Sequence, residues 1–465
     1  MNHIFRRELL DQLTSFKFAA GLLLIITLSS INGAVFSFLY ENERAEHRQV
    51  QRRWESQLAE RKKLDELPQQ VFAALKTPLK TAFLASGGQD RLPNEYHFTI
   101  NIWGEMPGTR RAFSQNVLIE SFTAVDWSFL VGAAFSLLAL VFVYDSVSGE
   151  KAQGTLKLLQ TYSLSRNSIL FGKLLANLAT LLMMLLAGML LSLILLVLGG
   201  VELGPAELVR TGLFLLLSLF YITLFLSIGF FLSTVTHRPT ATMVLAVMVW
   251  VVSIVVIPGA GTLLVQRIHK LPASNEIWES SSRVWRQIDE EYKGASSTWR
   301  GREMGKGDNY LAERQSTIAQ NKRKHLQEAI WEDYLRKKFA QAGIVRRISS
   351  LSPTGLFEYG AESLNGAGVL REELLVAQGH QYRSQIEEWI RQRDLADSES
   401  PHLCFQPGYL SLASLQTASV PRFQYHEPSV TDGVRDAVWK IAMLSAETLV
   451  MLFAAVLAFQ HYDVR

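Results

Sequence analysis

The sequence contains a single cysteine, Cys404, among 465 residues. No disulfide can therefore form within the chain, and any exported domain must be held together by packing alone. The sequence also lacks a G-x-x-x-x-G-K-[ST] phosphate-binding loop. The closest segment, residues 301–307 (G-R-E-M-G-K-G), has the wrong spacing and no hydroxyl residue for magnesium. These absences exclude a disulfide-stabilised scaffold and a nucleotide-hydrolysing site built from this sequence.

Motifs for metal binding and covalent catalysis are also missing. The sequence has no H-E-x-x-H, no C-x-x-C and no G-x-S-x-G, and its 10 histidines are scattered. A membrane-bound enzyme is therefore unsupported, although catalytic residues far apart in the sequence would escape a motif search. The net charge of +3 is nearly balanced, which argues against nucleic acid as the main partner.

Apolar residues are abundant and segregated into blocks. They make up 48% of the chain, yet the mean hydropathy is only +0.12, so polar stretches must separate them. A block of about 20 apolar residues is long enough to cross a bilayer. We predict an all-α polytopic membrane protein with six transmembrane helices, at residues 18–40, 125–144, 174–199, 211–235, 240–262 and 437–459. The first block is too long for a cleaved signal peptide and lacks a small-x-small cleavage site, so it is interpreted as an uncleaved span.

Charges in the short connections predict the orientation. Basic residues gather on the side that holds residues 1–17, an amphipathic interfacial helix, whereas the 200–210 connection carries Glu202 and Glu207. The basic set is Arg6, Arg7, Lys17, Lys151, Lys157, Arg166, Lys173 and Arg238. Because positive loops stay in the cytoplasm, we expect residues 145–173, 236–239 and 460–465 and both termini to be cytoplasmic.

The two long polar insertions, 41–124 and 263–436, are then extracytoplasmic, and we expect them to form one mainly helical domain with minor β structure. We predict helices at 41–67, 275–292, 310–341 and 372–394, a helix start at Pro353, a strand at 96–103 and loops at 398–428. The basic run 321–325 is interpreted as a solvated helix face rather than a partner or lipid patch, because acidic residues flank it.

One polar segment between the second and third spans, residues 145–176, is unlike the rest of the chain. Asp145 and Ser146 are good helix N-cap types, Glu150 falls near the first turn, and Leu156 and Leu159 share one helical face. Gly154 allows a bend, and a second helix start follows at Ser165. These residues predict a short helix lying along the membrane surface.

Within this segment, the pattern resembles the coupling segment of ATP-binding cassette (ABC) transporter permeases of the type-2 exporter family, in the variety with large extracytoplasmic insertions. The matching positions are Glu150, Gly154-Thr155-Leu156, Leu158-Leu159, Ser163-Leu164-Ser165-Arg166 and Gly172-Lys173. The peptide from Ile348 to Pro353 with Phe357 is a weaker match to the same variety.

The resemblance implies a non-catalytic permease subunit in the inner membrane of a bacterium. It implies two copies of a separate ATPase subunit, which hold the ATP and magnesium, and a second permease, identical or paralogous. Glu150, Lys157 and Arg166 would make polar contacts with the ATPase, and Leu156 and Leu159 would form the apolar seat. Gly154, Thr155 and Lys173 complete the coupling set. The expected activity is export of an unknown, amphiphilic substrate.

Two alternatives remain open, and one further motif is set aside. The segment could be an interfacial helix without a partner, as in a membrane anchor or an enzyme with no ATPase. The complex could instead transmit force to extracytoplasmic proteins without moving a solute, as some large-insertion relatives are thought to do. Residues 85–90 (A-S-G-G-Q-D) look like an ABC ATPase signature peptide, but without a phosphate loop they are interpreted as an ordinary turn.

Glu447 lies near the middle of the sixth predicted span. An ionisable group there is costly, by about 2.5–3.5 kcal/mol on insertion scales, so we expect it to face another helix or a watery cavity. It is either a substrate-path or gating contact, together with Asn177, or a buried hydrogen-bonding group paired with Asn177, Asn32 or a hydroxyl of a neighbouring span.

Overall fold

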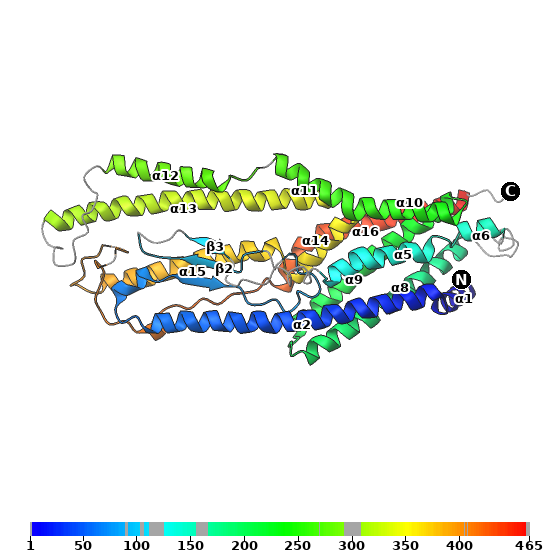
Figure 1. Cartoon of the computed structure of the whole chain (residues 1–465), viewed down its shortest axis with the longest axis horizontal. Helices are drawn as coiled ribbons and strands as arrows, with labels where there is room; N and C mark the ends of the chain where they lie inside the picture. The colour runs from blue at the N-terminus through cyan, green and yellow to red at the C-terminus, as the bar shows by residue number, and fades with distance from the viewer. Residues whose placement is uncertain are drawn as a thin grey trace.

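The chain is elongated, with its membrane-spanning helices at one end and a soluble domain at the other (Figure 1). The computed structural model describes residues 2–88, 92–102, 107–110, 125–154, 166–268, 270–292, 308–403, 405–406 and 408–461. Both termini and helix α6 (Ser148–Gln153) lie together, at what we call the terminal end. Helices α12 (Ser274–Glu291), α13 (Asp308–Ser349) and α15 (Val369–Leu395) lie at the opposite, domain end.

Six helices in the described part of the chain are long and apolar enough to cross a membrane. They are Phe16–Ala59 (α2), Trp127–Gln153, Arg166–Leu198 (α8), Pro205–Val235 (α9), Pro239–Val265 and Val430–His461 (α16). The second comprises α4 (Trp127–Phe129), a π-helical turn at Leu130–Phe135, α5 (Ser136–Val143) and α6. The fifth comprises α10 (Pro239–Val251), a π-helical turn at Val252–Val256 and the start of α11 (Ile257–Ile268). The predicted all-α polytopic membrane fold with six spans is confirmed.

Local sequence signals set where several of these helices begin. The Ser15 hydroxyl accepts from the Phe18 N–H to cap α2, and the Asp126 carboxylate accepts from the Phe129 N–H to cap α4. Helices α9 and α10 both start with proline, whose fixed φ and missing N–H suit the first helical turn. α14 (Pro353–Asn365) starts in the same way, as expected from Pro353, with Ser352 as its cap.

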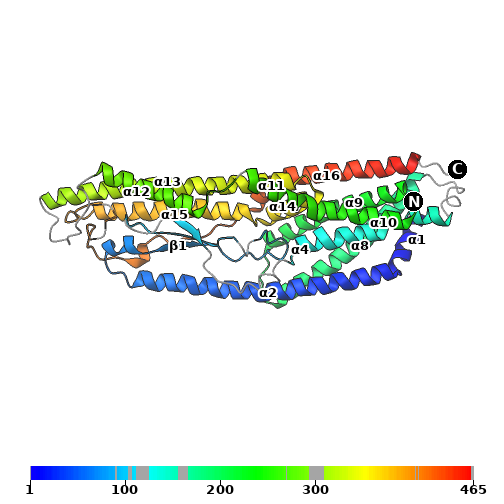
Figure 2. The same ribbon diagram turned by 45° about the horizontal axis from the view of Figure 1, so that its top comes forward.

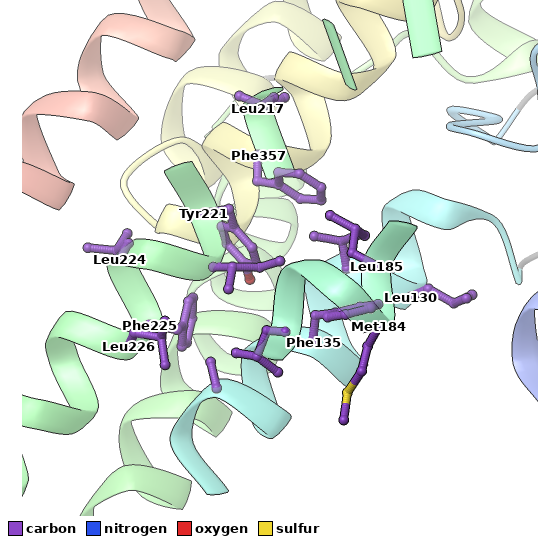
Figure 3. Packing of buried hydrophobic residues seen from close by; sticks show 14 of the residues in the cluster. Leu130, Phe135, Met184, Leu185, Leu217, Tyr221, Leu224, Phe225, Leu226 and Phe357 are labelled. Atoms are coloured by element: carbon purple, nitrogen blue, oxygen red, sulfur yellow. The ribbon is translucent and has the colours of Figure 1, made fainter. Parts of the chain in front are cut away.

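The core of the spanning region is assembled around α9 and α14 (Figure 3). Tyr221 of α9 is fully buried; its hydroxyl donates to the Gly132 carbonyl and lies 3.0 Å from the Thr354 hydroxyl. The Tyr221 ring stacks on Phe357 of α14 at 4.5 Å. Helix α14 also reaches the second π-helical turn, because the Ser352 hydroxyl donates to the Ser253 carbonyl. This helix therefore connects the two π-helical turns, where the regular hydrogen-bonding ladder of both spans is interrupted.

The soluble domain has its own apolar core, built from a small sheet and α15. Strands β1 (Phe72–Leu75), β2 (Glu95–Phe98) and β3 (Gly108–Arg110) form an antiparallel sheet in the order β1-β2-β3. The rings of Phe72 and Phe98 stack at 5.4 Å, and Tyr382 of α15 meets both edge-on. Short 3-10 turns occur at Leu64–Gln69 and Thr417–Ser419.

The first span and the first soluble segment share one helix. Helix α2 continues through residue 40 to Ala59 without a break. The hydropathy pattern instead predicts a span that ends at residue 40 and a separate helix that ends near residue 67. At about 1.5 Å per residue, its 44 residues extend about 66 Å. Figure 2 shows α2 running from the terminal end to the domain end. The last helix at the C-terminal side, α16, also begins before its predicted boundary, at Val430.

The basic run on α13 is not a solvated face, so that prediction is wrong for two of its residues. Arg323 and Lys324 are buried and donate hydrogen bonds to backbone carbonyls of residues 99–102 after β2. Burial lowers the pKa of Lys324 to about 8. The carbonyls beyond the end of a short strand have no partner strand, and the two cations satisfy them.

Candidate functional site

Helix α6 and its flanks form a ledge at the terminal end, which we define as residues 145–154 and 166–173. The helix is short, and the N–H groups of Val147 and Ser148 donate to the hydroxyl of Ser233 on α9. Its N-cap is Val147 rather than the expected Asp145 or Ser146. Gly154 ends the helix in the left-handed conformation, with φ +73°, which a residue without a Cβ adopts at no steric cost. The predicted seat residues Thr155, Leu156, Lys157 and Leu159 lie outside the described residues.

Lys173 holds the ledge to two other helices. Its Nζ lies 2.8 Å from Oε1 of Glu150 on α6 and 2.8 Å from Oε1 of Glu8 on α1 (Asn2–Leu13). The Lys173 side chain is 7% exposed, whereas the two carboxylates are 20% and 25% exposed. The ammonium is therefore removed from water only because two anions surround it. We call Glu8, Glu150 and Lys173 the Lys173 cluster.

A second ion pair and a close packing contact reinforce this arrangement. The Nζ of Lys17 lies 2.8 Å from Oδ2 of Asp145 and 4.6 Å from the centroid of the Tyr144 ring. Gly172 of α8 faces Ile4 of α1 so closely that an added Cβ would lie 2.9 Å from Ile4 Cγ2. Because Glu8 and Ile4 of α1 both contact α8, the amphipathic N-terminal helix is part of the ledge's support.

The ledge is also joined to the ends of α9 and α16. Lys151 donates to the carbonyls of Thr234 and Thr236 at the C-terminal end of α9. Arg166 donates to the Gln460 carbonyl of α16 at 2.6 Å, and the Gln460 amide donates to Asn167 Oδ1 at 2.9 Å. Lysine and arginine are well placed here, since a helix C-terminus presents unpaired carbonyls and a negative dipole end.

Contacts around the ledge link helices from distant parts of the sequence. The Lys173 cluster, the Lys17–Asp145 pair and the two carbonyl contacts join α1, α2, α6, α8, α9 and α16 at one end of the molecule. The described residues contain no group of three or more His, Cys, Asp or Glu side chains placed to hold a metal ion. These contacts link all six helices at the terminal end.

Of the predicted coupling residues, the structure brings Glu150 and Lys173 into direct contact and places Arg166 against α16. Their expected contacts with an ATPase remain predictions. The sequence pattern did not indicate Glu8, Asp145 or Ser233 as partners within the ledge. Lys17 and Asp145 are 128 positions apart, and at that separation opposite charges alone do not indicate which residues pair.

Neither predicted membrane-path residue pairs with the other. The fully buried Asn177 donates to the Lys173 carbonyl of its own helix, and Asn32 donates to the carbonyls of Phe83 and Val125. Within the described chain, Oε2 of Glu447 is buried without a hydrogen-bond partner, and no hydrogen bond joins Glu447 to Asn177, Asn32 or a hydroxyl. Both interpretations of Glu447, as a membrane-path contact and as a buried hydrogen-bonding group, remain predictions.

Comparison with known families decides the identity. A family model described as ABC-2 family transporter protein matches residues 2–464. The chain belongs to the ABC-2 transporter family. No curated protein shows significant similarity to it. Membership makes this multi-pass membrane protein an ABC transporter permease subunit and implies partnership with an ABC ATPase subunit.

Proposed function

We propose that this ABC-2 permease is the membrane subunit of an exporter, driven by two separate ATPase subunits that press on the ledge. The observation that carries the proposal is the Lys173 cluster, which joins the predicted coupling segment to α1 and α8. ATP and magnesium would be held by the ATPase subunits. The chain itself supplies no phosphate loop and therefore needs an external source of work.

The proposed mechanism is a switch between two packings of rigid helices. Closure of the ATPase pair would displace residues 150–166, with Leu156 and Leu159 as the apolar seat and Lys157 and Arg166 as polar contacts. Ion pairs and carbonyl contacts carry the displacement into α8, α9 and α16. Packed helices respond by moving between discrete arrangements rather than by bending continuously.

A second permease copy, or a paralogue, would cover the exposed face of α16. Met443 and Val450 are 46% and 65% exposed, and Glu447 lies between them at helical spacing. A carboxylate that faces lipid is costly in free energy. A helix of a second permease, or a path between two permeases, would surround it with polar groups or water instead. An apolar path with one carboxylate suits an amphiphilic substrate.

The terminal end is assigned to the cytoplasm and the domain end to the outside of a bacterial inner membrane. Arg6, Arg7, Lys17, Lys151, Lys173 and Arg238 lie on segments at the terminal end, and the positive-inside rule favours that side as cytoplasmic. The domain would then be periplasmic.

Force transmission without solute export is a second candidate function, and one observation favours it. Helix α2 is continuous from the ledge to the soluble domain. At the junction, the Arg210 guanidinium of α9 donates to the carbonyls of Leu364 and Pro428. Spans and domain would therefore move as coupled bodies, which suits action on an extracytoplasmic protein partner.

Affinity purification of the tagged full chain from its native membrane in mild detergent tests the ATPase partnership. We expect an ABC ATPase to co-purify in equal numbers with the permease. Leu156→Asp and Arg166→Glu should each lower its recovery several-fold. Leu311→Asp and Arg52→Glu, matched changes at exposed positions on α13 and α2, should not. Absence of an ATPase, or equal recovery with all four variants, would contradict the proposal.

A further inference from the structure

The soluble domain contains a pocket that no part of the proposed function uses. It has a volume of about 380 Å³ and lies between α2, β1, Tyr382 of α15 and residues 422–425. This volume falls within the range of about 300–1,000 Å³ found for ligand pockets. Its lining includes four aromatic rings, Trp54, Tyr382, Phe423 and Tyr425, and several polar side chains, among them Glu55 and Arg422. Trp54 and Ala73 also line a neighbouring, more polar groove of about 780 Å³, so the two hollows share a wall.

Strand β1 presents a free edge to this pocket. It lies at the edge of the sheet and pairs only with β2 among the described strands. The Lys76 N–H donates to the Asn94 carbonyl, so these two residues form a hydrogen-bonded pair. Along an antiparallel pair of strands, hydrogen-bonded residues alternate with residues whose N–H and C=O point away from the partner strand. Ala73 and Leu75 are therefore the residues whose N–H and C=O point away from β2, and within the described chain no hydrogen bond satisfies them. Both residues line the pocket.

The opposite side of the pocket also has unpaired backbone groups. Residues 422–425 have no regular secondary structure, and no hydrogen bond within the described chain involves their backbone N–H or C=O groups. Between the two segments, Nε1 of Trp54 is buried without a hydrogen-bond partner among the described residues. An unpaired indole N–H is costly to bury, so this donor calls for an acceptor from a bound molecule.

Buried hydrogen-bond donors lie beside Thr77, at one end of the pocket. The Arg371 side chain is fully buried; it donates to the Thr77 carbonyl and lies 5.4 Å from the Tyr425 ring. Lys76 is also buried. Oε1 of Glu427 lies 3.4 Å from Nη2 of Arg371 and accepts a hydrogen bond from the Thr77 hydroxyl at 2.9 Å. Nε and Nη1 of Arg371 and Nζ of Lys76 have no hydrogen-bond partner in the described chain. Three buried donor atoms at this end therefore have no acceptor in the described chain, and a ligand carboxylate would supply one.

We propose that this pocket binds an extended peptide segment of a partner protein, which adds a strand to the β1 edge, inserts an apolar side chain among Trp54, Tyr382 and Phe423, and directs a carboxylate toward the Thr77 end. Addition of a strand to a free sheet edge is an established mode of peptide recognition. A small amphiphile would fill the aromatic part of the pocket but leave the backbone groups of Ala73 and Leu75 unpaired. The peptide satisfies both, and its recognition does not depend on the ATPase.

Fluorescence polarisation with the purified full chain in detergent micelles tests the proposal. The probes are fluorescein-labelled pentapeptides Thr-Val-X-Thr-Val, with X as Phe, Leu, Trp or Ala, each as a free acid and as an amide. We expect the acids with an apolar X to bind, the Ala peptide to bind about tenfold more weakly and the amides several-fold more weakly. Dodecanoate serves as the small-amphiphile probe.

Three variants separate the contributions. Trp54→Phe replaces the indole by a smaller aromatic ring without the N–H, and Ala73→Pro removes one outward N–H at an edge where proline is tolerated. Each should weaken peptide binding about tenfold. Trp278→Phe, at a 75% exposed position on α12, is the matched control and should have no effect. Peptide binding that is absent, or insensitive to Trp54→Phe and Ala73→Pro, overturns the proposal. Tight dodecanoate binding without peptide binding overturns it in favour of a small amphiphile, and equal binding of acids and amides overturns the carboxylate assignment.

Discussion

Two buried lysines show how the surroundings of a residue determine its role. Lys173 is surrounded by two carboxylates and acts as a charged connector, whereas Lys76 is 4% exposed and has no hydrogen-bond partner in the described chain. Burial, with Arg371 nearby, lowers the pKa of Lys76 to about 7. The first lysine stabilises the fold only as a cation, and the second destabilises it as a cation.

Lys76→Met should stabilise the soluble domain in a pH-dependent way. Because the folded-state pKa of Lys76, about 7, lies below its ordinary value of 10.5, the unfolded chain binds more protons between these pH values. The free energy of unfolding of the wild type therefore rises with pH from about 7 to 10.5. The variant should gain up to about 4 kcal/mol at pH 6 and little at pH 10.5. Thermal unfolding of the wild type and the variant across this pH range measures the gain. An equal gain at every pH would contradict a lowered pKa for Lys76.

Lys173→Met should destabilise the ledge, because it leaves the Glu8 and Glu150 carboxylates facing each other without a cation. Since both carboxylates are partly exposed, we expect a loss of about 2 kcal/mol, below the range for a fully buried pair. The triple variant Lys173→Met, Glu8→Gln, Glu150→Gln should recover most of the loss. Thermal unfolding in micelles provides the comparison. A single variant as stable as the wild type would show that the cluster contributes no net stability.

At the scale of elements, close packing fixes how α15 covers the sheet. Gly379 of α15 faces the ring of Tyr96 on β2 so closely that an added Cβ would lie 2.3 Å from Tyr96 Cδ1. The helix and the strand can approach this closely only because the residue has no side chain. The contact aligns Tyr382, one turn further along α15, with Phe72 and Phe98.

Gly379→Ala should therefore destabilise the domain, by about 1–3 kcal/mol, because α15 must move away from Tyr96. The matched control is Gly343→Ala on α13, where an added Cβ meets no atom within 4 Å. In that control, the better helix propensity of alanine should raise the free energy of unfolding by up to about 1 kcal/mol. Chemical denaturation should show a lower free energy of unfolding for Gly379→Ala and an equal or higher one for Gly343→Ala. A loss with Gly343→Ala of the same size would show that the effect is not specific to the contact.

At the scale of the whole molecule, charged connections and the soluble domain occupy opposite ends. The ledge, α1 and the C-terminal end of α16 lie together, and the domain formed by residues from both long insertions lies at the far end (Figure 1). Helix α2 and the α9–α14 junction connect the two ends. Motion at one end can therefore reach the other through continuous helices.

Labelling with a membrane-impermeant maleimide on intact cells checks the orientation. In a Cys404→Ser background, Arg314→Cys on an exposed part of α13 should react, whereas Lys157→Cys should react only after permeabilisation. Cys404→Ser alone is the unlabelled control. Reaction of the Lys157→Cys protein in intact cells would reverse the proposed orientation and remove the basis for ATPase coupling.

The sequence determined the fold class and the place of the ledge. Long uncharged blocks predict membrane spans because the bilayer tolerates few charges, and this constraint acts on each segment separately. The helix start at Pro353 could likewise be predicted locally, since the fixed φ belongs to that one residue, whereas Gly154, expected to allow a bend, ends α6. The burial of Arg323 and Lys324 could not be predicted from the local sequence, because it depends on carbonyls more than 200 residues away in the chain.

What only the tertiary structure decided is which charges meet. Lys173 joins Glu8 and Glu150, Asp145 pairs with Lys17 instead of capping α6, and a free β1 edge faces an aromatic pocket. Hydropathy and helical periodicity act along the chain and can be read from composition. Ion pairs and pockets depend on distances across the fold, which packing of the helices sets and which no spacing within a segment encodes.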